Sequence, residues 1–185
     1  FWLGCDAQRY WWFDLSDKPR TLFVGTHDRY ETSAARRVGV VVPPRDLVCL
    51  LGIVPLPEQG GLTQYSSDKK LIGVTTNLPS GQRQRMWLNP VSWLPVKIEL
   101  YNTFGDLELV ADLSQPDSVD IRGYPNKPTI NTRAIIGHQA SRSEITIDLS
   151  DMQDGKDRIV PEAFDLNLLA QRLRAEKAYD LDTPL

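Results

Sequence analysis

Hydrophobic and polar residues alternate over short stretches of this chain, and turn-forming residues close most of them. In residues 96–101 (VKIELY), Val96, Ile98 and Leu100 share one face of an extended segment, and the polar side chains share the other. Residues 107–113 repeat the pattern after an Asn-Thr-Phe-Gly-Asp turn. Such alternation predicts an antiparallel meander that has one apolar face and one polar face.

The same alternation, bounded by turn residues, predicts most of the other strands. We expect them at residues 9–15, 20–25, 38–42, 62–67, 70–76, 83–88, 132–137 and 144–149. Residues 117–133 are rich in Pro and Asn and are expected to form a loop.

Two helices are predicted. Residues 45–53 follow a Pro-Pro pair and carry leucines at helical spacing. Residues 164–179 have Asp165 as N-cap and an apolar stripe that begins at Leu166 and ends at Leu173. We find neither an internal repeat nor a linker, so the chain is predicted to be one domain over residues 1–185, mainly β with one or two helices.

The aromatic run Tyr10-Trp11-Trp12-Phe13 places rings on both faces of one predicted strand. Leaving two of these rings in water would cost on the order of a few kcal/mol. Both faces of the strand are therefore expected to be covered. One reading is a strand sandwiched between core and helix, and the other is the wall of an apolar cavity.

Composition narrows the function classes. The formal net charge of the 185 residues is −3 and Lys and Arg form no block, which argues against a nucleic-acid surface. No apolar run approaches the ~20 residues that span a bilayer. The sequence begins without Met or a signal peptide, so we expect it to continue upstream. Cys5 and Cys49 leave open a disulfide or two buried thiols.

Candidate reactive groups are few. His27 and His138 are the only histidines, and both are expected at ordinary surface positions. Residues 151–157 faintly resemble a calcium loop but lack its ligand spacing, so a solvated acidic loop is preferred. We find no motif for a nucleophile, a phosphate or a metal. The sequence therefore predicts a protein that is not an enzyme and has no cofactor and no metal site.

Leu3-Gly4-Cys5 looks like the end of a lipobox, in which the cysteine carries a lipid. A lipobox needs an apolar signal helix before it and a flexible tether after it. Here an aromatic strand begins almost at once. Cys5 is therefore predicted to be a strand or turn residue.

The segment RMWLNPVSWLPVKIELYNTFGDLELVADLS (residues 85–114) resembles the outer-membrane lipoprotein carrier (LolA/LolB-like) superfamily. A Leu-Asn-Pro turn is followed by a Leu-Pro-Val-Lys-Ile strand and a turn at Gly105. The hairpin from Gly4 to Phe13, residues 47–57 (LVCLLGIVPLP), residues 145–149 and residues 164–166 resemble other parts of that pattern, in the same order.

This resemblance implies an incomplete antiparallel β-barrel wrapped around one or two helices, with its first helix and strands upstream of Phe1. It also implies an apolar concave face that binds a lipid or a lipoprotein acyl chain, in the bacterial periplasm or outer envelope, with membrane association through an upstream lipid anchor. A structural or protein-interaction module with a self-filled barrel is the first alternative, and a hydrolase using His27 or His138 is the second. Residues expected to line the cavity or the core are Trp11, Phe13, Phe23, Leu47, Leu50, Leu51, Met86, Leu88, Ile98, Leu100, Leu107 and Leu109.

Overall fold

A computed structural model of the chain describes residues 2–16, 18–32, 42, 44–52, 61–78, 81–120, 127–150 and 161–183. Contacts divide the chain into two compact units. The first comprises Phe1–Leu47 and Gly155–Leu185, and the second comprises Val48–Asp154. The single domain expected over residues 1–185 stays a prediction.

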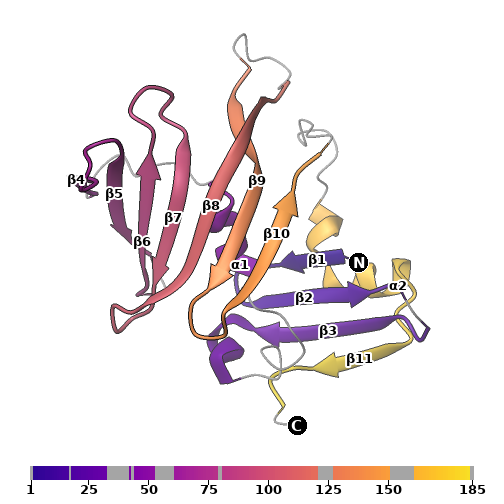
Figure 1. Ribbon diagram of the computed structural model, residues 1–185. Coiled ribbons are helices and arrows are strands. Elements are labelled where there is room, and N and C mark those ends of the chain that lie inside the picture. Colours follow the sequence, from indigo (N-terminus) through magenta and orange to yellow (C-terminus); the bar gives the residue numbers. More distant parts are fainter. Residues whose placement is uncertain are drawn as a thin grey trace. The chain divides into compact units, whose positions relative to one another are not determined.

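The first unit contains a four-stranded sheet in the order β1-β2-β3-β11, with antiparallel pairs except for the parallel pair of β3 and β11 (Figure 1). Its strands are β1 (Trp2–Cys5), β2 (Arg9–Asp14), β3 (Thr21–Thr26) and β11 (Lys177–Asp180). Its helical segments are η1 (His27–Thr32), η3 (Pro161–Phe164) and α2 (Leu166–Arg172). Cys5 pairs with Tyr10 inside the β1–β2 hairpin, which confirms that it is a strand residue.

Both faces of β2 are covered, as the aromatic run predicts. Tyr10, Trp11 and Phe13 are 0% exposed and Trp12 is 9% exposed. Two clusters account for this burial. Trp11 and Phe13 pack with Leu22, Leu166 and Leu169, whereas Tyr10 and Trp12 pack with Tyr30 and Leu181. The sandwiched-strand reading is therefore confirmed for β2.

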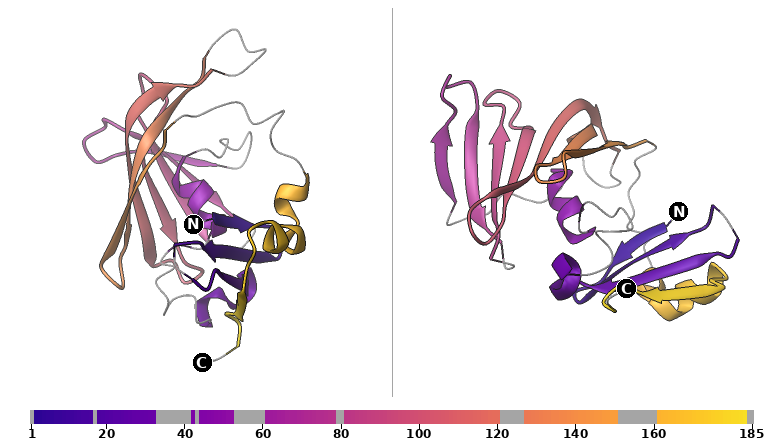
Figure 2. Two further views of the ribbon diagram at one scale, coloured as in Figure 1. Left: turned by 90° about the vertical axis from the view of Figure 1, so that its right-hand side faces the viewer. Right: turned by 60° about the horizontal axis from the view of Figure 1, so that its bottom comes forward.

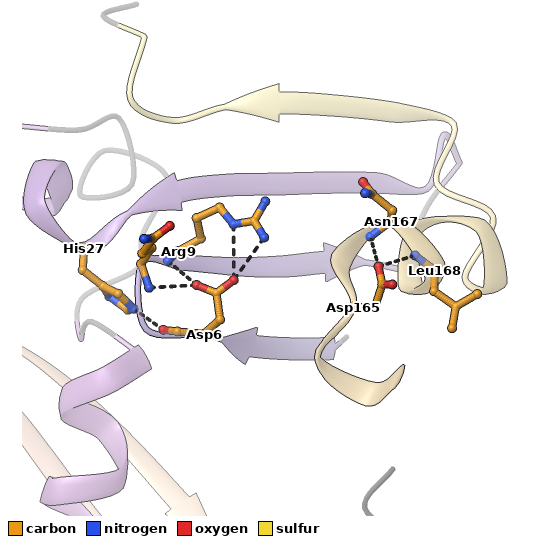
Figure 3. A network of polar contacts seen from close by, with 7 residues as sticks. Asp6, Arg9, His27, Asp165, Asn167 and Leu168 are labelled. Atoms are coloured by element: carbon orange, nitrogen blue, oxygen red, sulfur yellow. Dashed lines mark hydrogen bonds and ion pairs between the residues drawn. The ribbon is translucent and has the colours of Figure 1, made fainter. Parts of the chain in front are cut away.

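Helix α2 begins as predicted and ends earlier than predicted. The Asp165 carboxylate accepts hydrogen bonds from the backbone N–H groups of Asn167 and Leu168, both at 3.0 Å (Figure 3). The prediction that the helix continues to residue 179 is wrong. Arg174 has a φ of 54°, which stops the helix, and β11 then pairs with β3. All four residues of β11 are exposed, so no apolar alternation signals this strand in the sequence.

The second unit contains a seven-stranded antiparallel sheet in the order β10-β9-β8-β7-β6-β5-β4 (Figure 2). Each strand follows its neighbour in the chain, so the sheet is a meander, and β4 and β10 form its two open edges. The strands are β4 (Leu62–Tyr65), β5 (Ile72–Asn77), β6 (Arg83–Leu88), β7 (Pro95–Tyr101), β8 (Leu107–Ser118), β9 (Thr129–His138) and β10 (Ser143–Asp148).

The predicted fold class, mainly β with an incomplete antiparallel sheet and two helices, is confirmed. The other helix, α1 (Pro44–Leu50), confirms that the stretch expected at 45–53 is helical, although it ends at Leu50. The loop expected at 117–133 is shorter, because β8 and β9 stay paired as far as Ser118 and Thr129. Most of the strand expected at 38–42, and all of the acidic segment 151–157, lie outside the described residues.

Three glycines stand directly opposite an aromatic residue on the neighbouring strand. The pairs are Gly4 with Trp11, Gly25 with Tyr10, and Gly73 with Trp87. A Cβ atom on Gly73 would lie 2.8 Å from the ring of Trp87, and one on Gly4 would lie 2.7 Å from Nε1 of Trp11. The missing side chains therefore let these rings lie on the facing strand, the arrangement known as aromatic rescue of glycine.

Candidate functional site

The seven-stranded sheet has one apolar face, which we call the inner face. Strand register defines it by a row of directly opposed apolar residues on six successive strands, one residue per strand. From β5 to β10 the row is Val74, Met86, Ile98, Ala111, Ile136 and Ile145. The four central residues are at most 5% exposed, and Val74 and Ile145 at the ends are half-buried.

The turn that follows α1 approaches this inner face. Leu50 is 0% exposed. Gly52 follows with a φ of 71°, and a Cβ atom there would lie 2.9 Å from Pro95 and 3.0 Å from Leu113. A glycine is thus needed for both the left-handed backbone and the close approach to β7 and β8.

The structure brings together six of the predicted site residues in the second unit. Leu50 and five inner-face side chains are at most 5% exposed, the latter being Met86, Leu88, Ile98, Leu100 and Leu109. Leu51 is half-buried after α1. Leu107 is 36% exposed and is therefore not a core residue, and its assignment to the cavity stays a prediction. It lies at the start of β8, where the register with β7 shifts and the alternation is interrupted.

The other predicted site residues belong to the first unit. Trp11 and Phe13 form part of the core under α2. Phe23 is half-buried and stacks between Trp12 and Tyr179, with ring centroids 4.6 and 5.5 Å away. Leu47 is half-buried in α1.

Two buried polar side chains on the inner face were not expected from the sequence. Register places Gln84, Leu100, Leu109 and His138 directly opposite one another on β6 to β9. Gln84 is 5% exposed, and its Nε2 atom has no hydrogen-bond partner among the residues that the structure describes. Its place in the alternating strand RQRMWL, two residues before Met86, is the sequence signal that it faces inward.

Both histidines are buried, so the expectation of ordinary surface positions is wrong. His27 is 8% exposed, and its Nε2 atom lies 3.0 Å from the backbone oxygen of Asp6 (Figure 3). His138 is 7% exposed, and its Nδ1 atom lies 2.8 Å from the Ser141 hydroxyl oxygen and 3.1 Å from the Ser141 backbone nitrogen. The contacts between His138 and Ser141 close the turn between β9 and β10. The alternative that the protein is a hydrolase using His27 or His138 stays a prediction.

The opposite side of the same sheet, which we call the outer face, carries a charged and aromatic network. Arg85 lies 3.4 Å from the Glu99 carboxylate and donates a hydrogen bond to the Tyr101 hydroxyl at 3.0 Å. That hydroxyl donates to Glu99 at 2.8 Å. Burial, followed by this bond to Glu99, raises the pKa of Tyr101 above its ordinary value. The Arg-x-Arg-x-Trp spacing of β6 is the only sequence signal for the network.

In the described part of the chain, no three His, Cys, Asp or Glu side chains are grouped so that they could hold a metal ion. Among the same residues, no helix has both the length and the hydropathy required to cross a membrane.

Comparison with known proteins gives a likeness in structure. No family model matches the chain, and no curated protein matches its sequence. A LolA superfamily protein from Nitrosomonas europaea is 21% identical with a TM-score of 0.47, over 87% of this chain and 67% of that one. An outer membrane lipoprotein-sorting protein domain from Vibrio parahaemolyticus is 17% identical with a TM-score of 0.44, over 60% of this chain and 46% of that one.

The second match thus spans less than half of the Vibrio chain. Both descriptions name lipoprotein sorting or the superfamily that the sequence motifs resemble. At these identities and TM-scores the likeness is one of fold and carries no conclusion about a shared ligand.

Proposed function

We propose that the inner face binds an apolar ligand, a lipid or the acyl chain of a lipoprotein, and that the protein is a non-enzymatic carrier of the bacterial periplasm or outer envelope. One observation supports this most: the apolar row from Val74 to Ile145 runs across six strands of a sheet with two open edges. An acyl chain needs such a broad apolar surface rather than a few placed polar groups.

The ends of the row are the points at which a ligand would gain most. Val74 on β5 and Ile145 on β10 keep part of their surface in water. Each methylene group of an acyl chain removed from water against such side chains is worth about 0.8 kcal/mol. A chain of several methylene groups would thus bind through burial alone, without a reactive residue.

Binding of a fluorescent long-chain fatty acid to the delipidated protein tests this proposal. Val74→Asp places a carboxylate at one end of the apolar row, and we expect it to weaken binding by about tenfold, because a charge near an acyl chain loses its hydration. Thr75→Asp is the matched control, since the next residue on β5 points to the outer face. Equal affinities for both variants and the native protein would refute the proposal.

A structural or protein-interaction module with a self-filled barrel is the rival function, and one observation favours it. Ile98 and Leu100, at the centre of the inner face, are already 0% exposed within the chain. For such a module, no saturable fatty-acid binding is expected at any concentration. Saturable binding that Val74→Asp weakens and Thr75→Asp leaves unchanged would exclude the rival.

A further inference from the structure

Arg83 differs from the other half-buried arginines of the described residues. Arg20 donates to a backbone carbonyl at 3.1 Å, Arg85 lies beside Glu99, and Arg133 binds Asp148 at 2.7 Å. Among the described residues Arg83 has no such oxygen partner. Its guanidinium lies 4.8 Å from the centroid of the Tyr101 ring, and its Nε atom is buried without a hydrogen bond to that part of the chain. Its positive charge is therefore uncompensated in a site that is partly withdrawn from water.

The neighbours of Arg83 leave one net positive charge on this part of the outer face. Arg83 and Arg85 both lie over Tyr101, with guanidinium carbons 4.8 and 5.3 Å from the ring centroid. Glu99 compensates Arg85. The amide-bearing Asn77 stands directly opposite Arg83 on β5, and Tyr101 stands directly opposite it on β7. Arg83 thus lies between two polar residues of the neighbouring strands.

We propose that Arg83, with Asn77 and Tyr101 beside it, binds a carboxylate from an acidic peptide segment of a partner protein. A guanidinium binds a carboxylate through two parallel hydrogen bonds, and the stacked ring fixes the guanidinium plane. One carboxylate of such a segment matches the single net positive charge. A doubly charged phosphate would be left partly uncompensated, and Glu99 would repel it more strongly.

The surroundings of Arg83 suit a protein partner. Trp87 lies on the same face of β6, with the Arg85 guanidinium carbon 5.6 Å from its ring centroid. Arg, Trp and Tyr are the residue types that most often dominate binding energy at protein interfaces. Since this patch lies on the outer face, it is on the opposite side of the sheet from the proposed ligand, and the two proposals can be tested separately.

Nuclear magnetic resonance of the full ¹⁵N-labelled chain tests the site, because an arginine Nε–H group gives its own signal. A pentaglutamate peptide blocked at both ends is the probe, and pentaglutamine is the uncharged control. We expect pentaglutamate to shift the Arg83 Nε–H signal saturably and pentaglutamine to leave it unchanged. Arg83→Gln should weaken pentaglutamate binding by about fivefold or more, since charge-assisted hydrogen bonds are lost.

Arg142→Gln is the matched control, because it removes the same charge from an exposed arginine in the turn between β9 and β10. It should bind the peptide as the native chain does. Equal weakening by both variants would show general electrostatic attraction and overturn the site. Inorganic phosphate that binds at Arg83 as tightly as pentaglutamate would overturn the assignment to a carboxylate.

A stability measurement guards against misfolding of the variants. Arg83→Gln removes an uncompensated charge, so its thermal midpoint should equal or exceed that of the native chain. Arg85→Gln should lower the midpoint, because it leaves the Glu99 carboxylate without its cation. A lower midpoint for Arg83→Gln than for Arg85→Gln would mean that Arg83 has a structural role and would overturn the proposal.

Discussion

Two strands of this protein, β2 and β6, use their faces in opposite ways. All four aromatic residues of β2 are buried, two toward α2 and two toward Tyr30 and Leu181. In β6 only every second residue is buried. A strand that is buried on both faces requires other elements, distant in the sequence, to pack on each face. A strand with alternating burial requires such packing on one face only. The second face of β6 is therefore available for charged groups such as Arg83.

The largest expected effect concerns the doubly covered strand. Phe13→Ala removes a ring that is 0% exposed and packs against Leu166 and Leu169. We expect a loss of about 3–5 kcal/mol in the free energy of unfolding, since the cavity cannot collapse between a sheet and a helix. Urea denaturation followed by circular dichroism measures it. Phe104→Ala, at a turn residue that is 89% exposed, should change stability very little. A similar loss in the free energy of unfolding for both variants would contradict the view that β2 depends on packing on both of its faces.

Sequence patterns predict the alternating strands well, because in them local chemistry and burial agree. The boundaries of β6 are those expected, and β7 differs by one residue. The pattern fails at Lys177–Asp180, where all four residues are exposed and the strand is placed by backbone pairing with β3. Backbone pairing between segments more than 150 residues apart leaves no trace in local periodicity.

The candidate site shows the same limit. The apolar alternation of β6 to β8 predicts the inner-face residues, because a fixed period of two places them on one side. It cannot predict that Arg85 has a carboxylate partner whereas Arg83 has none in the described part of the chain, since such partners come from another strand through the register. It also misses the burial of His138, which terminates a strand beside a turn.

A smaller loss of stability is expected from a substitution of Gly73, the glycine of the seven-stranded sheet on which the Trp87 ring lies. In Gly73→Ala the added methyl group would lie 2.8 Å from the Trp87 ring, which must move, so we expect a loss of about 1–3 kcal/mol. Gly137→Ala is the matched control in β9, because no atom lies within 4 Å of the added carbon. Its stability should stay the same or rise by up to about 1 kcal/mol. Thermal unfolding of both variants decides the point.

The helix that covers β2 offers a still smaller effect. Asp165→Ala leaves the backbone N–H groups of Asn167 and Leu168 without their acceptor. The expected cost is about 1 kcal/mol, the usual value for an N-cap. Asn167→Ala, two residues on in the exposed part of the first turn, keeps the cap and should cost less than half as much. If Asn167→Ala proved the more damaging variant in urea titration, the cap would not be what starts α2.

The smallest effect is a pH dependence at the β1–β2 turn. Burial of Asp6 raises its pKa, but bonds from the backbone N–H groups of Arg9 and Gln8, and then from the Arg9 side chain, outweigh it and lower the pKa below 3.8 (Figure 3). The ionised form is therefore favoured in the folded state. Its stabilisation is present above the unfolded pKa and is lost as the pH falls through the folded one.

Asp6→Asn should therefore weaken the loss of stability between about pH 5 and pH 2, measured by urea titration at each pH. Arg9→Gln separates the causes, since it removes the side-chain ion pair at 3.1 Å and keeps the backbone bond to the Asp6 carboxylate at 2.6 Å. Because the backbone bonds contribute more, Arg9→Gln should retain most of the acid sensitivity that Asp6→Asn loses. If the stability of Asp6→Asn and of the native chain fell in the same way with decreasing pH, this turn would not link folding of the four-stranded sheet to pH.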